Sequence, residues 1–427
     1  MMKNISVLLV SIFLWKFSFE QVKANNDLKT LINQSFSFFP KIQEVENTVK
    51  TGEEKLELTS LNKTPDISFS TSYNYIMPKI SFPINGNEIQ FAPVNNVATS
   101  VGTTYTLLDF GRLKSNINKA KADIEISKDN VKMAKNQLAN QIAAIYYNIV
   151  YFKKAIVIQD SIIDYFRQNK QLAENKMKSG DMLQIDVLNL QSNIDAEQNK
   201  KIDLINNLNK QLNLLEYTTG AKLSKGDIFD FDLDMSTINI GIAEANNPEF
   251  KLAKDKIISS QKDVDIAKLN SKPRLSLNAA TGIKNGYVPD VNEIRFNYLA
   301  GLTFSLPIYG FGKTKQQIKV QESVVKQYQL SQTTLLSNYK KDIDQTLLDI
   351  NSAVERIANT ESQLQATKQA QQITASRYRN GVATYLDVTA AATNVEKAAF
   401  SKLQYEYQLC QSKVELARLL GFEYWSN

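Results

Sequence analysis

Few side chains in this chain of 427 residues could carry out covalent chemistry. Histidine is absent, and the only cysteine, Cys410, lies in a helical pattern near the C-terminus. These counts exclude His- and Cys-based catalytic dyads, Cys/His zinc sites and internal disulfides. No glycine-rich phosphate loop is present, and the acidic stretch from Asp227 to Asp234 is typical of a solvated turn. The sequence therefore predicts no enzyme, no cofactor and no metal site.

Nucleic acid is not an expected partner either. The net charge is +6, and no basic cluster is interleaved with aromatic residues. Such a cluster is the usual electrostatic footprint of a nucleic-acid-binding protein. The remaining charged groups of interest are therefore those that stand at special positions in the predicted structure.

Two carboxylates stand at such positions, each shortly after a glycine-containing turn. Asp186 lies six residues after Gly180, and Asp387 lies six residues after Gly381. Glycine in these turns is expected to supply the positive φ that ends a helix. The carboxylates would then lie in the first turn of the following helix, where the helix dipole favours a negative charge.

The local chemistry expected of these turns is helix capping. The segment from Thr384 to Asp387 fits a capping box, in which threonine and acid each satisfy the other's backbone N–H. Asp181 and Gln184 are predicted to do the same in the first turn. Capping alone could explain both acids, and it is also compatible with a further role.

The elements that position these turns are helices of unusual length. Residues 112–178 have the pattern of one helix, which reverses at 179–181 and returns as a second helix ending at 219. At 1.5 Å per residue the first arm would be about 100 Å long, far beyond an ordinary globular helix. Apolar residues spaced seven apart form a seam that winds against a neighbouring helix. The seam consists of Ile117, Ile124, Val131, Leu138, Ile145 and Phe152.

The same plan occurs twice at an offset of 201 residues, which indicates a tandem duplication. The paired landmarks are Gly111 with Gly312, Gly180 with Gly381, Asp186 with Asp387, and Gly220 with Gly421. The prediction is a first repeat over 25–220, a linker over 221–247 and a second repeat over 248–427. Each repeat would contain a short helix, a β-hairpin (66–108 or 274–306) and a long helical hairpin (112–219 or 313–420).

The predicted strands have one apolar or aromatic face and one face of small polar residues, over about ten residues each. This alternation is typical of transmembrane β-strands, whose outward side chains meet lipid and whose inward side chains meet water. A β-hairpin on a soluble core is the alternative. The segment with Pro83, Gly86 and Pro93 is predicted to be a polar loop. The residues expected to face lipid are Phe69, Tyr73, Val101, Tyr105, Phe296, Tyr298 and Phe304.

Strands in a membrane would require several copies of this chain. Four strands cannot close a barrel, and an open sheet edge in lipid would leave backbone groups unpaired. The helical seams also need more partners than two hairpins provide. A shared barrel built from several chains satisfies both requirements.

The N-terminus has the pattern of a secretory signal peptide. Lys3 precedes an apolar run from Ile5 to Leu14, and a mixed segment follows it. We predict a signal peptide over residues 1–24, with cleavage after Ala24. A membrane anchor helix is the alternative, although the run is too short to span a bilayer and Lys16 interrupts it.

Taken together, these features resemble the TolC-type outer-membrane efflux protein family. The resemblance covers essentially the whole mature chain. It rests on the strand-to-helix motifs Leu107-Leu108-Asp109-Phe110-Gly111-Arg112 and Leu306-Pro307-Ile308-Tyr309-Gly310-Phe311-Gly312-Lys313, on Asn247-Pro248-Glu249-Phe250-Lys251, and on the two hairpin tips around Gly180 and Gly381.

The resemblance implies a mainly α fold with a membrane β part. Three chains would share a twelve-stranded transmembrane β-barrel in the outer membrane of a Gram-negative bacterium. Their helical hairpins would form an α-barrel tunnel into the periplasm. A periplasmic adaptor (membrane fusion protein) and an inner-membrane transporter would be the partners, in efflux or type I secretion. The alternative is a secreted or periplasmic coiled-coil protein, either structural or the adaptor itself.

The resemblance also gives roles to the tip residues. Asp387 would form an acidic, cation-attracting ring at the pore aperture. The ring would be single, because Ala390 stands where the family often has a second aspartate. Tyr378 would hydrogen-bond Asp186 to hold the tip shut, while a closing arginine is replaced by Ala383. The adaptor-contacting residues would be Ser179, Gly180, Asp181, Asn380, Gly381 and Val382.

Overall fold

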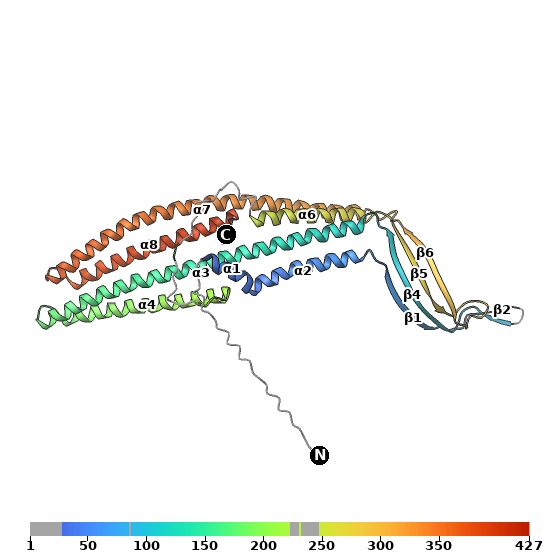
Figure 1. Cartoon of the computed structure of the whole chain (residues 1–427), viewed down its shortest axis with the longest axis horizontal. Coiled ribbons are helices and arrows are strands. Elements are labelled where there is room, and N and C mark those ends of the chain that lie inside the picture. The colour runs from blue at the N-terminus through green and yellow to red at the C-terminus, as the bar shows by residue number, and fades with distance from the viewer. Residues whose placement is uncertain (1–27, 85–86, 223–229, 232–246, 427) are drawn as a thin grey trace, which may run out of the picture.

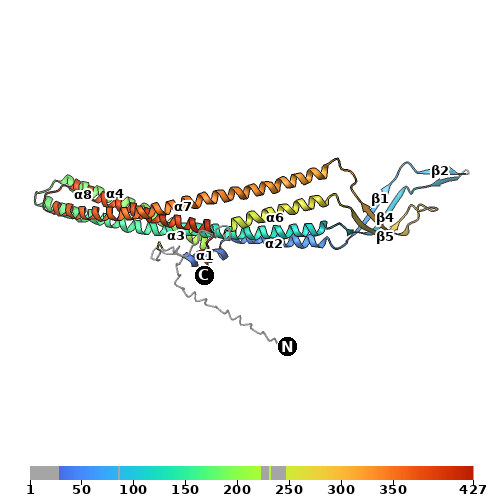
Figure 2. The same ribbon diagram turned by 90° about the horizontal axis from the view of Figure 1, so that it is seen from above.

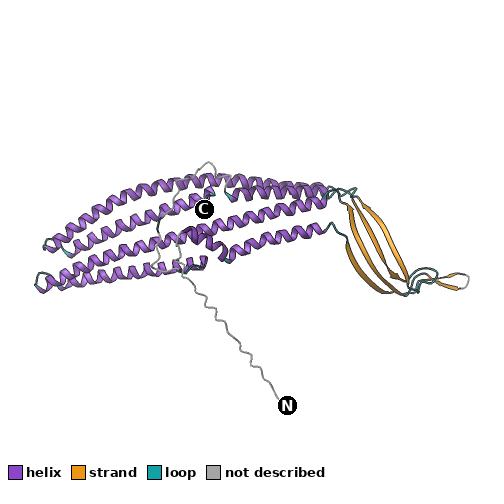
Figure 3. Ribbon diagram, viewed as in Figure 1, coloured by secondary structure: helices purple, strands orange, loops and turns teal. Residues whose placement is uncertain are grey.

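The computed structural model describes residues 28–84, 87–222, 230–231 and 247–426. They form an elongated body, with a sheet at one end and helical hairpin tips at the other (Figures 1 and 3). The predicted signal peptide, most of the predicted linker and most of the acidic stretch lie outside the described residues. None of the described helices has the length and hydrophobicity needed to cross a bilayer.

Two helical hairpins run most of the length of the molecule. The first consists of α3 (Arg112–Lys178) and α4 (Gln184–Thr219), and the second of α7 (Lys313–Arg379) and α8 (Tyr385–Leu420). The two longer helices have 67 residues each, about 100 Å at the α-helical rise. These are the arms that the seven-residue spacing predicts.

Shorter helices extend the bundle toward the sheet. Helix α2 (Pro40–Leu61) continues the line of α4, and α6 (Pro248–Leu269) continues the line of α8 (Figure 1). Helix α6 lies between α3 and α7 in both views (Figure 2). Helix α1 (Leu28–Phe38) packs on α3 and α4 at mid-length, and Phe39 separates it from α2. Each repeat therefore contributes one unbroken helix and one line of two helices.

The sheet contains four antiparallel strands in the order β1-β4-β5-β6. They are β1 (Asp66–Tyr75), β4 (Asn95–Leu108), β5 (Arg274–Lys284) and β6 (Arg295–Ser305). Phe69 is opposite Val101, Tyr105 opposite Leu277, and Thr281 opposite Tyr298. Opposed residues share a face, and alternate residues along a strand share it too. All seven residues predicted to face lipid therefore lie on one face of this sheet.

The prediction of a loop between β1 and β4 is wrong in part. Two short strands, β2 (Ser81–Ile84) and β3 (Asn87–Gln90), pair with each other there. The sequence between them is Asn85-Gly86, a dipeptide that favours the two-residue turns of tight hairpins. The prolines at 83 and 93 masked this signal, since proline weakens a strand prediction.

The largest buried cluster lies at mid-length, where α1, α3, α4 and α8 meet the C-terminal segment. Tyr147 and Ile142 of α3 are fully buried there, and so is Leu215 of α4. Tyr424 and Trp425 cover them from the C-terminal segment. A second buried cluster nearer the tips joins α3 and α4 to α8. These two clusters thus hold the two hairpins together between mid-length and the tips.

Candidate functional site

The candidate site is the end of the molecule where the two hairpins reverse. Both turns have the same backbone geometry. At the first tip Gly180 has a φ of 83°, and the Asp181 amide donates to the Lys176 carbonyl at 2.9 Å. At the second tip Gly381 has a φ of 76°, and the next amide donates in the same way at 2.9 Å. This is the Schellman ending of a helix, in which a left-handed residue turns the chain back.

The helices that follow the turns begin differently. Thr384 and Asp387 form the predicted capping box at the start of α8. The carboxylate of Asp387 accepts bonds from the Thr384 amide at 2.8 Å and from its hydroxyl at 2.9 Å. The hydroxyl oxygen in turn accepts from the Asp387 amide at 3.3 Å.

The capping predicted for Asp181 and Gln184 is wrong. Helix α4 begins at Gln184, so Leu183 occupies the position before it and offers no side-chain acceptor. Asp181 is two residues too early to cap this helix, and its carboxylate accepts from the Ser179 hydroxyl at 2.9 Å. The first tip therefore ties its turn together without capping the next helix.

Asp387 is exposed and ionised. Its bonds from the amide and hydroxyl of Thr384, aided by the charge of Arg377, lower the pKa of this carboxyl below its ordinary value. An exposed carboxylate with a lowered pKa keeps its negative charge at neutral pH. Its hydrogen bonds within the described chain are all with Thr384, so no hydrogen bond ties it to Asp186 or Tyr378, the other two predicted aperture residues.

Tyr378 makes a different bond from the one expected. Its side chain is fully buried, and its hydroxyl donates to the sulfur of Met182 at 3.3 Å rather than to Asp186. Burial, together with the nearby charge of Asp186, raises the pKa of Tyr378 to about 12. The two residues are therefore neighbours in an electrostatic sense without a hydrogen bond between them.

Lys176 is a tip residue that the sequence analysis missed. Its ammonium group donates to the Tyr378 carbonyl at 2.9 Å and lies 5.7 Å from the centre of the Tyr378 ring. It thus ties the end of α3 to the end of α7, the two helices that precede the turns. The available signal was its place in the last turn of a helix, where a cation can bond terminal carbonyls.

The predicted adaptor-contacting residues are all exposed. They sit in the two turns, which lie at the same end of the molecule (Figure 1). Val382 is 65% exposed, and Leu183 and Leu386 beside the turns are 69% and 62% exposed. Both tips therefore have exposed apolar side chains and exposed turn residues in the single chain.

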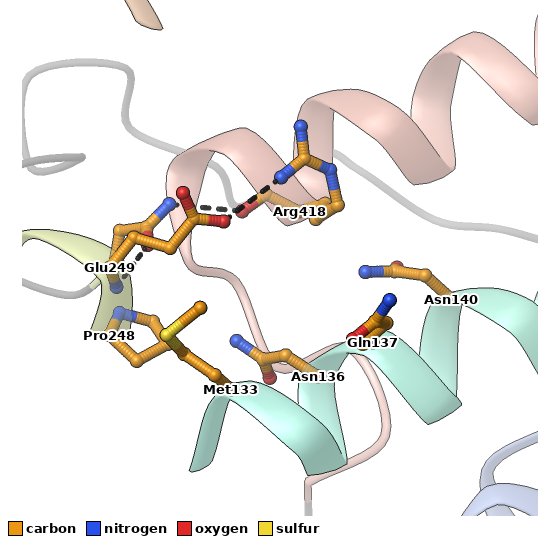
Figure 4. Close-up of a pocket in the computed structure, with 8 residues that line it drawn as sticks. Met133, Asn136, Gln137, Asn140, Pro248, Glu249 and Arg418 are labelled. Carbon is orange, nitrogen blue, oxygen red and sulfur yellow. Dashed lines mark hydrogen bonds and ion pairs between the residues drawn. The ribbon is translucent and has the colours of Figure 1, made fainter. Parts of the chain in front are cut away.

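A separate cavity of about 400 Å³ lies far from the tips, at the joint between α8 and α6 (Figure 4). Asn247 caps both helices there, because its oxygen accepts from the Glu249 amide and its nitrogen donates to the Leu419 carbonyl. Arg418 closes the joint by bonding Glu249 at 3.3 Å and Glu415 at 2.6 Å. The residues around this cavity therefore join α8 and α6 end to end.

Comparison with known proteins identifies the family. The sequence profile of the outer membrane efflux protein family matches residues 31–221 and 239–422. The matched segments cover most of the chain, which therefore belongs to this family. The resemblance inferred from the sequence is confirmed, and the chain is an outer-membrane efflux channel protein.

Individual relatives are distant in sequence and close in fold. The chain is 22% identical over 324 residues to toxin and drug export protein A of Aggregatibacter actinomycetemcomitans, covering 74% of this chain and 70% of that protein. Among solved structures it resembles the outer-membrane channel OprN, with a TM-score of 0.79, 17% identity and coverage of 93% and 91%. It also resembles the outer membrane protein VceC of Vibrio cholerae, with a TM-score of 0.76, 16% identity and coverage of 93% and 97%. The predicted fold class is confirmed, and the family and these neighbours are channels rather than enzymes.

Proposed function

We propose that three copies of this chain form a channel-tunnel through the outer membrane and into the periplasm. It conducts substrate passively from an adaptor and inner-membrane transporter to the exterior, in a tripartite efflux or type I secretion system. Residues 1–24 are the signal peptide that brings the chain to the periplasm. Two structural repeats, 25–220 and 248–427, joined by 221–247, build each third of the channel.

The observation that carries the proposal is the four-stranded sheet. Its apolar residues gather on one face and are exposed there: Phe69 is 69% exposed, Phe296 71% and Tyr298 82%. Its outer strands, β1 and β6, each pair with only one neighbour among the described strands. A bilayer offers no water to these edges, so pairing with further copies is required. Three sheets of four strands give a barrel of twelve strands.

The helical end supports the same assembly. Apolar side chains on α7 and α4 are exposed in the single chain, among them Val320, Leu348, Ile185 and Ile202. Exposed apolar side chains along long helices are typical of surfaces that pack against other helices. Neighbouring copies would bury these side chains and enclose a tunnel.

The tips form the aperture and the adaptor contact in this proposal. Three copies of Asp387 on a narrow axis place three negative charges around the path, which attracts cations. Asp186 lies beside the buried Tyr378, and both residues shape the closed tip. The exposed turn residues of both tips meet the adaptor. The name of the curated relative, a toxin and drug export protein, agrees with export as the task.

A matched pair of variants in one strand tests the membrane assignment. Phe69 and Ser70 are neighbours in β1 and point to opposite faces of the sheet. Phe69→Lys should strongly reduce the amount of trimer recovered from outer membranes, because a lysine on the lipid face of a barrel is destabilising by about 2–4 kcal/mol near the midplane. Ser70→Lys should assemble nearly as well as the wild type, because its side chain faces the water-filled lumen.

Mass measurement of the detergent-extracted protein gives the readout. A trimer that fractionates with the outer membrane and is sensitive only to Phe69→Lys supports the proposal. A chain recovered without detergent, equally tolerant of both substitutions, would favour the secreted coiled-coil alternative.

A further inference from the structure

Three polar contacts join α4 of the first hairpin to α8 of the second. They recur at the same spacing of four and then seven residues along both helices, so they lie on one face of each. We call them the α4–α8 rungs. They are Asn189 to the Tyr385 hydroxyl at 2.9 Å, Asn193 to the Thr389 hydroxyl at 3.2 Å, and Lys200 to Glu396 at 2.8 Å.

The rung farthest from the tips differs from the other two. The ammonium group of Lys200 bonds Glu396 on α8 and also Glu197 on its own helix, at 2.8 and 2.9 Å. The side chains of these glutamates are only 15% and 10% exposed. Gln159 of α3 donates to the Glu197 carboxylate in turn. This rung therefore connects three helices, whereas each of the others is a single neutral hydrogen bond.

Within the described part of the chain, this rung also contains the only ion pair that joins the long helices of one hairpin to those of the other. Lys176 bonds across the hairpins too, at the tips, but its partner is the neutral carbonyl of Tyr378. Every other ion pair between two described residues of the long helices stays within one hairpin, as Lys201 with Asp160 does. Burial opposes the charge of Lys200, but the bonds to Glu396 and Glu197 outweigh it and raise the pKa of the lysine. The cation is thus permanent at any physiological pH.

We propose that Lys200 is a positioning residue that sets where the two hairpins begin to separate when the tips open. The inference rests on the proposed channel function. A single neutral hydrogen bond is weaker than a charge-assisted contact in which one group makes several bonds. Along the α4–α8 contact, the two neutral rungs nearer the tips therefore break before the Lys200 rung. The Lys200 rung stays closed and acts as the fulcrum, the point from which the two hairpins separate.

The charges around Lys200 explain why it has this role. Without the ammonium group, Glu197 and Glu396 would face each other across the seam with no cation between them, and like charges repel. The apolar cluster at this level, with Ile194 and Val395, packs without directional bonds and does not fix the register of the helices. Loss of Lys200 should therefore move the point of separation away from the tips.

Distance measurement between spin labels tests this fulcrum. Labels at Leu183→Cys and Leu386→Cys report the separation of the tips, since both side chains are exposed. The background carries Cys410→Ala, and labelled protein is diluted with unlabelled full-length chain. In Lys200→Met the distance within one chain should lengthen by about 5 Å or more, one turn of helix, with a broader distribution. Glu396→Gln should shift it in the same direction, so the test survives if one variant folds poorly.

The matched control is Lys201→Met. It removes an ion pair from the adjacent residue of the same helix, but that pair lies within the first hairpin. Its distance should equal the wild-type value. The exchange of charges in Lys200→Glu with Glu396→Lys should restore the short distance. Equal distances in Lys200→Met, Lys201→Met and wild type would overturn the proposal.

Conductance in planar bilayers separates this inference from the proposed function. A conducting wild type whose openings and tip distance do not respond to Lys200→Met leaves the channel standing and removes the fulcrum. A tip distance that responds in a protein that never conducts keeps the fulcrum and removes the channel. Larger openings in Lys200→Met than in Lys201→Met support both.

Discussion

The two hairpin tips share a backbone and differ in side chains. Both turns end a helix on a left-handed glycine, with the same pair of backbone bonds. Only the second tip then caps its next helix, through Thr384 and Asp387, while Leu183 stands at the equivalent place in the first. Duplication preserved the turn, and divergence gave the second tip a charged, ordered helix start. In the proposed channel, this difference favours the second tip as the place of the Asp387 ring.

The largest expected difference between the tips concerns the second-to-last residue of α3 and of α7. Tyr378 is fully buried, whereas Met177, its counterpart at the offset of 201, is only half-buried. Tyr378→Ala should lower the free energy of unfolding by about 3 kcal/mol, as removal of a large buried ring usually does. Met177→Ala should have a clearly smaller effect. Thermal unfolding followed by circular dichroism measures both, and equal shifts would contradict the asymmetry.

Removal of the cap should have a moderate effect, confined to one tip. Thr384→Ala should destabilise the start of α8 by about 1 kcal/mol, the usual contribution of an N-cap. Backbone amide exchange in the first turn of α8 should then speed up about fivefold, since 1 kcal/mol is a factor of about 5. Leu183→Ala is the control and should leave exchange in the first turn of α4 unchanged. A similar response at both tips would mean that the capping box does not order α8.

Acid should reproduce part of this effect in the wild type. The pKa of Asp387 is lowered in the folded state, so its contribution is present above the ordinary carboxyl pKa and is lost as the pH falls through the lowered one. Amide exchange at the start of α8, corrected for its intrinsic pH dependence, should therefore rise as the pH falls below about 4. The start of α4, which has no such cap, should change less. An unchanged α8 start down to pH 2 would show that the carboxylate does not stabilise it.

The smallest difference is expected at the glycines themselves. Gly180→Ala and Gly381→Ala should each lower stability by about 1 kcal/mol, because both residues have positive φ. Because the two turns match, the shifts in thermal midpoint should agree closely with each other. A large disagreement would reveal that one turn is held by contacts beyond its own backbone.

The long helices and the strands could be predicted because the sequence carries a repeating pattern over their whole length. The seven-residue seam and the offset of 201 predicted α3 and α7, and the alternation in 66–108 and 274–306 predicted which side chains share a face of the sheet. The capping box at Thr384 is a local pattern of four residues, and it is confirmed.

The wrong predictions and the missed residues have a common physical cause. Each depends on the exact start of a helix or on how the two hairpins pack in three dimensions. Asp181 could not cap α4 because the helix starts two residues later than a capping role requires. Tyr378 bonds Met182 because both are brought together by the packing of the two hairpins, which no local spacing encodes. Lys200 and Glu396 are 196 residues apart, and only the α4–α8 contact joins them.

The central claim is that three copies form a channel whose aperture carries a ring of Asp387 charges. Single-channel recording of the detergent-extracted mature protein in a planar bilayer tests it most directly, with Asp387→Ala and Thr384→Ala compared. Both variants remove the cap, but only Asp387→Ala removes the charge. The account predicts steady, cation-selective openings whose selectivity falls in Asp387→Ala and persists in Thr384→Ala. A well-folded trimer that never conducts, or a selectivity untouched by Asp387→Ala, would contradict it.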